Sequence, residues 1–243
     1  MVQTVRALLV CDCWCRMNEK VVDRYKDKAD ILSLPLSYPI WNNPEIVESI
    51  TACAQMLRSL HRWNEILVIG HEPSGVAAAH QVFSQTFRGL VAVDSERLRT
   101  ERLAPKEPVH FLAACSDFRY QHALQSYVEG YVGERTCVLQ TPSPVKRFVE
   151  HRTRPIMLQL LNYMASRCSL TSFSLFNHLD CGGFGGSSSF EGREVEEETN
   201  RHFLLGAQRL IEEHVPECIF RMSDIFDTPY AAYAPRAEIA QAP

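Results

Sequence analysis

The chain has 243 residues, 46% of them hydrophobic, and a net charge of −4 at neutral pH. This is enough apolar material for one large domain or two small ones, and the lack of a long basic run argues against nucleic acid or an anionic membrane as a partner. No apolar stretch reaches transmembrane length, and the first residues lead into a strand rather than a signal peptide. Because the nine cysteines are odd in number and several fall on core-like segments, we expect a cytoplasmic protein with reduced thiols.

Apolar runs alternate with amphipathic segments along the whole chain. In the first half we expect strands at 7–11, 30–36, 65–69 and 89–93, with helices at 44–60 and 75–85. In the second half we expect strands at 109–114, 136–140, 172–176 and 218–222, with helices at 154–166 and 196–214. The alternation predicts an α/β fold in which mainly parallel sheets are flanked by helices.

The order of these elements also indicates an internal repeat. Segment 65–75 parallels segment 172–182 (172 − 65 = 107), and segment 8–16 parallels segment 111–119 (111 − 8 = 103). We therefore predict two tandem repeats, residues 1–105 and residues 106–243. A stretch rich in proline and charge at 97–108 is the expected linker.

Two short motifs in the second half carry reactive side chains. Residues 115–119 read C-S-D-F-R after one apolar run, and residues 178–181 read H-L-D-C where another run breaks into a glycine-rich turn. Zinc binds Cys sulfur and His nitrogen, and three protein ligands leave its fourth tetrahedral position for a water molecule. Since the carboxyl ends of parallel strands meet at one edge of a sheet, Cys115, His178 and Cys181 are expected to hold one zinc ion.

The first motif also supplies a carboxylate next to a guanidinium. Two thiolates and a neutral imidazole cancel the charge of zinc, so this metal activates its water less than an ion held by three imidazoles would. Asp117, kept ionised by Arg119, can accept the proton of a zinc-bound hydroxide and direct its lone pair at an electrophile. If Arg119 released it, the same carboxylate would close the site as a fourth ligand.

The pattern C-x-D-x-R followed by H-x-x-C-G resembles the β-class carbonic anhydrases, above all their short prokaryotic members, over roughly residues 106 to 225. The resemblance implies zinc on Cys115, His178 and Cys181, with Asp117 and Arg119 as the catalytic dyad. It implies reversible hydration of carbon dioxide to bicarbonate by zinc-bound hydroxide. Enzymes of this class form dimers in which each pocket is partly walled by the partner. By this resemblance the two repeats are expected to pack as a pseudo-dimer within one chain, which leaves further homo-oligomers open.

Three other functions stay open on the sequence alone. The family commonly has a small residue where Phe118 stands, and a narrower pocket would favour hydrolysis of carbonyl sulfide or carbon disulfide. A non-catalytic zinc- or anion-binding module follows if Asp117 permanently occupies the fourth position. Cys11, Cys13 and Cys15 would be a thiol redox site, although no Cys-x-x-Cys opens a helix there.

The first repeat has lost most of this chemistry. Ser74 stands where the second repeat has Cys181, and Trp14 stands at the position of Asp117. We expect the first repeat to serve as scaffold. A second metal site, formed by one of the cysteines at 11, 13 and 15 with His71 and Glu72, is the alternative.

Glycines and the remaining cysteines have simpler interpretations. The glycine-rich turn at 182–186 lacks the Gly-Lys-Ser/Thr of a nucleotide phosphate loop. It is expected to wrap the metal and to leave room for a small anion such as bicarbonate. Four further cysteines are expected to be small core hydrophobes: Cys53, Cys137, Cys168 and Cys218.

Overall fold

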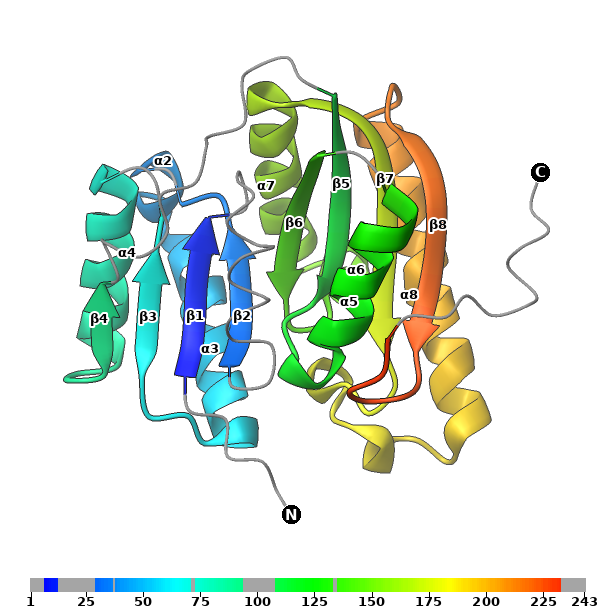
Figure 1. Cartoon of the computed structure of the whole chain (residues 1–243), viewed down its shortest axis with the longest axis horizontal. Coiled ribbons are helices and arrows are strands. Elements are labelled where there is room, and N and C mark those ends of the chain that lie inside the picture. Colours follow the sequence, from blue (N-terminus) through cyan, green and yellow to red (C-terminus); the bar gives the residue numbers. More distant parts are fainter. Residues whose placement is uncertain are drawn as a thin grey trace.

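A computed structural model describes residues 7–12, 29–36, 38–70, 73–93, 108–132 and 135–232. Its strands are β1 (Ala7–Asp12), β2 (Ala29–Leu34), β3 (Ile66–Ile69), β4 (Val91–Val93), β5 (Pro108–Cys115), β6 (Arg135–Thr141), β7 (Ser169–His178) and β8 (Ile219–Phe226). They form one sheet in the order β4-β3-β1-β2-β6-β5-β7-β8 (Figure 1). Each of the eight predicted strand segments overlaps one of these strands, and the α/β prediction is confirmed.

Helices cover both faces of the sheet (Figure 1). They are α2 (Tyr38–Trp41), α3 (Pro44–His61), α4 (Pro73–Thr86), α5 (Gln121–Tyr127), α6 (Pro144–Val149), α7 (Arg154–Arg167) and α8 (Arg193–His214), with short helical turns η1 (Phe118–Tyr120), η2 (Val128–Val132), η3 (Gly182–Phe184) and η4 (Ser187–Ser189). The four predicted helices are present, whereas α2, α5 and α6 were not anticipated because each is too short to show a periodic apolar pattern. No helix in the described part of the chain combines the length and apolar character needed to cross a bilayer.

The central strands are apolar on both sides because both of their faces are covered. Alternate residues of β5 face opposite layers: Phe111 and Ala113 belong to the core beneath α6, α7 and α8, and Leu112 and Ala114 belong to the core beneath α5. Such strands read as continuous apolar runs, which is the pattern that parallel sheets give.

The two halves of the chain share one sheet instead of forming separate ones. Within each half every strand pair is parallel. Counted from the start of each half, the strands lie in the order 2-1-3-4 in both. The halves meet where β2 pairs antiparallel with β6, through Ser33 and Gln140. The carboxyl ends of β5 and β7 therefore lie at the same edge as the beginning of β2.

Helix α3 ends at that edge. Its N-terminus is capped by the Asn43 side chain, which accepts hydrogen bonds from the backbone N–H groups of Glu45 and Ile46. It terminates at Arg62, whose φ of 54° is left-handed. The last helical residue, His61, is thus held at the edge where β5 and β7 end. Of the expected linker, residues 97–107 lie outside the described residues, and Pro108 begins β5.

We expect a fragment of residues 106–243 to aggregate or to dimerise. Removing the first half turns β6 into an exposed edge strand and uncovers apolar surface, on the scale of roughly 2,000 Å² for an obligate interface. Size-exclusion chromatography with light scattering measures the outcome. A soluble monomeric fragment would show that the first half is an independent domain.

Candidate functional site

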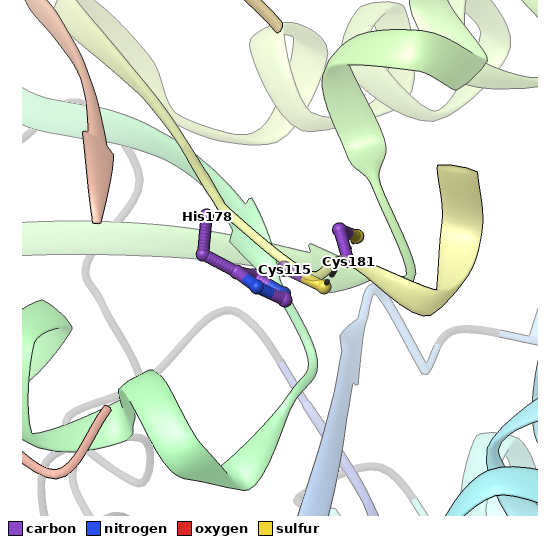
Figure 2. A group of neighbouring side chains, drawn as sticks. All are labelled: Cys115, His178 and Cys181. Carbon is purple, nitrogen blue, oxygen red and sulfur yellow. Dashed lines mark hydrogen bonds between the residues drawn. The ribbon is translucent and has the colours of Figure 1, made fainter. Parts of the chain in front are cut away.

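Three side chains converge at the carboxyl ends of two neighbouring strands. Cys115 is the last residue of β5, His178 is the last residue of β7, and Cys181 follows in the turn before η3 (Figure 2). All three are buried, and their Sγ and ring-nitrogen atoms lie within 4.8 Å of one another. The predicted convergence of these residues at one edge of the sheet is confirmed.

The spacing of the donor atoms fits a soft divalent metal such as zinc. The sulfur atoms of Cys115 and Cys181 are 3.8 Å apart. A tetrahedral ion with Zn–S bonds of about 2.3 Å places two sulfurs about 3.8 Å apart. The separation of these two buried sulfurs is therefore compatible with their holding one metal ion.

The imidazole of His178 presents its free nitrogen to the same point. Its Nδ1 lies 2.7 Å from the carbonyl oxygen of Leu179, which can only accept, so Nδ1 carries the proton and Nε2 carries the lone pair. Nε2 is buried and has no hydrogen-bond partner in the described part of the chain. An unpaired buried polar atom costs about 1–3 kcal/mol, a cost that coordination of a metal removes.

The position of the ring is fixed by Tyr120. The two rings stack with centroids 4.1 Å apart, and the Tyr120 hydroxyl donates to the carbonyl oxygen of Leu179 at 3.1 Å. The same carbonyl therefore anchors both His178 and Tyr120. No pattern in the sequence indicated a role for Tyr120, although this residue directly follows the first motif.

The surroundings of Cys115 favour a thiolate only when a cation is present. Burial, and then the neighbouring Cys181, raise the pKa of the Cys115 thiol well above its usual value, although His178 lowers it. The backbone N–H of Ser143 donates to the Cys115 sulfur at 3.5 Å. Gly183 allows this approach, because a Cβ at position 183 would lie 2.5 Å from the Ser143 Cβ. The glycine-rich turn therefore packs closely against the residue that donates to the Cys115 sulfur.

Asp117 and Arg119 form a bidentate ion pair next to the metal ligands. The Arg119 Nε and Nη2 atoms donate to the Asp117 carboxylate at 2.7–3.1 Å, and the Arg119 backbone N–H adds a bond of 3.0 Å. Burial by itself raises the pKa of Asp117, but the charges of His178 and Arg119 and the hydrogen bonds of Arg119 lower it below its usual value. The Asp117 Oδ2 atom lies 3.7 Å from His178 Nε2. The carboxylate is thus beside the ligand set and held by Arg119.

Asp180 also accepts hydrogen bonds from the guanidinium of Arg119. Arg119 Nη1 donates to the Asp180 carboxylate at 2.8 Å, and Nη2 donates to its backbone carbonyl at 3.0 Å. The backbone N–H of Asp180 donates to Glu196 of α8, which orients the turn. The sequence did not indicate that Asp180 binds Arg119, although Asp180 stands between two predicted ligands.

The ring of Phe118 packs against two other rings beside the site. It lies edge-on to His61 with centroids 5.2 Å apart, and 5.9 Å from the ring of Tyr230. His61 in turn pairs with Asp30 of β2. One ring nitrogen of His61 and one carboxylate oxygen from each of Asp30 and Asp117 lie within 4.8 Å of one another. No motif pointed to Asp30 and His61, which are 31 residues apart.

Several predictions for the first half fall on residues outside the described part of the chain: Cys13, Trp14, Cys15, His71 and Glu72. Cys11 is buried in β1, and Ser74 lies in the first turn of α4. A second metal site in the first half stays a prediction. The four cysteines expected in the core are all buried.

No family model matches this chain, and no curated protein matches it. The resemblance to β-class carbonic anhydrases therefore rests on the two motifs.

Proposed function

We propose that this chain is a zinc-dependent carbonic anhydrase that interconverts carbon dioxide and bicarbonate. One observation carries the proposal. A buried set of two cysteine sulfurs and one unpaired imidazole nitrogen lies beside a carboxylate that an arginine keeps ionised. Three protein ligands leave a tetrahedral metal one further position, and the carboxylate is near enough to accept a hydrogen bond from a group in that position.

Each residue has a defined part in this proposal. Cys115, His178 and Cys181 would hold the zinc, which supplies a Lewis acid that lowers the pKa of a water molecule to near neutrality. Asp117 would accept a hydrogen bond from that group and so orient it toward carbon dioxide. Arg119 keeps Asp117 ionised and, because it occupies both carboxylate oxygens, prevents the carboxylate from becoming a fourth ligand.

The proposal includes the organisation of the chain. Residues 1–105 would be a degenerate copy of residues 106–243, the two packed as a pseudo-dimer. The shared strand order 2-1-3-4 and the antiparallel contact between β2 and β6 support it, since a two-fold axis between two copies produces such a contact. Ser74, in the place of a ligand cysteine, is consistent with a first copy that lacks a metal.

We expect one zinc ion per chain. The substitutions Cys115→Ser, His178→Ala and Cys181→Ser should each abolish or greatly weaken zinc binding, because each removes one of three ligands. Cys218→Ser, which alters a buried cysteine just before the start of β8, is the matched control and should retain zinc. Elemental analysis of the purified proteins gives the stoichiometry, and two tightly held zinc ions per wild-type chain would contradict the proposed loss of the first site.

Arg119→Ala should retain zinc and lose activity. Without its guanidinium, Asp117 is free to ligate the metal and close the site, so hydration of carbon dioxide should fall roughly 10- to 100-fold, as for other groups that orient metal-site residues. Stopped-flow hydration assays measure the rate. Arg193→Ala is the control, because this exposed arginine lies outside the site and pairs with Glu197 and Asp227. Full activity in Arg119→Ala would refute the role given to the dyad.

A further inference from the structure

The first half contributes a hydrogen-bonded Asp–His pair to the edge of the sheet where Cys115, His178 and Cys181 lie. Asp30 is the second residue of β2 and is fully buried, and His61 is the last residue of α3. His61 Nδ1 lies 2.9 and 2.8 Å from the two carboxylate oxygens of Asp30. Because β2 runs antiparallel to β6, its beginning meets the carboxyl ends of β5 and β7.

The segment that follows β5 holds this pair in place. The backbone N–H of Phe118 donates to Asp30 Oδ1 at 3.3 Å, and the N–H of Ile31 donates to the carbonyl of Ser116 at 3.1 Å. The Phe118 ring meets the His61 ring edge-on, at an interplanar angle of 87°. The orientation of His61 is therefore set by the same loop that carries the proposed catalytic dyad.

His61 lies between the buried carboxylate of Asp117 and solvent. A ring nitrogen of His61 is within 4.8 Å of an Asp117 carboxylate oxygen, a gap that one water molecule spans with two hydrogen bonds of about 2.8 Å each. The side chain of His61 is 14% exposed, whereas that of Asp117 is 5% exposed. Nδ1 is held by both carboxylate oxygens of Asp30, which fixes the orientation of the ring.

We propose that His61, oriented by Asp30, carries the proton of the reaction between the metal site and solvent. The inference rests on the proposed function, in which carbon dioxide and water give bicarbonate and one proton. That proton passes through water to the imidazole of His61, and His61 then releases it to a buffer base. In the dehydration direction the proton follows the same route inward. Asp117 stays ionised throughout and accepts only hydrogen bonds.

The charges around His61 suit this task. Burial lowers the pKa of His61, but the hydrogen bond and charge of Asp30 and the charge of Asp117 together raise it above its usual value, against the opposing charge of Arg119. Burial raises the pKa of Asp30 to about 6, although its bond to His61 lowers it. Histidine is the side chain whose ordinary pKa lies nearest to neutral pH, which suits it to carrying a proton.

Asp180, the other titratable group that contacts Arg119 and reaches the surface, is less suited. Its two carboxylate oxygens already accept hydrogen bonds from Arg119 at 2.8 Å and from the backbone N–H of Ser187 at 3.0 Å.

A second metal ion between Asp30, His61 and Asp117 is the competing interpretation. The oxygens of Asp30 are already bonded to His61, and those of Asp117 are bonded to Arg119. Each carboxylate thus already faces a basic partner within the protein, which favours a relay over a metal site.

The test compares net hydration with exchange at equilibrium in the zinc-loaded full chain. Stopped-flow hydration requires the proton to leave, whereas isotope exchange between carbon dioxide and bicarbonate at chemical equilibrium does not require its release to buffer. In weakly buffered solution, His61→Gln should lower kcat for hydration about tenfold or more, change kcat/KM far less, and lose much less of the exchange rate. Added imidazole should restore kcat.

His214→Gln is the matched control. His214 is also the last residue of a helix, but it ends α8, about 33 Å long, whose beginning lies near the site. It should behave as the wild type in both assays, and all variants should hold one zinc. In addition, Asp30→Asn should lower the pKa of His61, measured by NMR titration, because the carboxylate charge is lost while burial remains.

The outcomes separate the relay from the proposed function. A wild-type chain that catalyses no exchange refutes the proposed function itself. Exchange in the wild type, together with undiminished hydration by His61→Gln in weak buffer, overturns the relay and leaves the function standing. A second metal ion per chain that His61→Gln loses would also overturn the relay.

Discussion

The antiparallel contact between β2 and β6 determines which residues of the first half lie beside the candidate metal ligands. Within each half the strands are parallel, so each half has a single carboxyl edge, and the antiparallel seam directs these two edges to opposite ends of the molecule. The start of β2 and the end of α3 consequently meet the ends of β5 and β7. Without the seam, Asp30 and His61 would not lie beside Asp117.

Ion pairs between Arg119 and two carboxylates hold the loops of the site together. Arg119 bonds simultaneously to Asp117 and Asp180, which lie in different loops. A planar guanidinium can serve two carboxylates because its donors diverge on several sides, a geometry that lysine lacks. Arg119 thereby links the loop after β5 to the turn after β7. The interaction that keeps Asp117 ionised also holds together the two segments that carry the candidate metal ligands.

Neighbouring groups hold Cys115 and His178 in their orientations. Tyr120 stacks on His178, Leu179 sets its tautomer, and Ser143 donates to the Cys115 sulfur. Such outer partners orient the ligands and tune their basicity. The close approach of Ser143 to Gly183 gives the glycine-rich turn a packing role as well.

The sequence by itself determined the strands, the long helices and the convergence of the three ligands, because these depend on local apolar runs and on the rule that parallel strands end at one edge. It also indicated the pairing of Asp117 with Arg119, two residues apart. Only the tertiary structure showed that the halves share one sheet and that Asp30 and His61 lie beside Asp117. Asp30 does stand out as a charge within an apolar run, but its partner is 31 residues away on a helix end with no motif. Contacts of that kind are set by how strands of different halves pair, and the register of such a seam is not encoded in any local pattern.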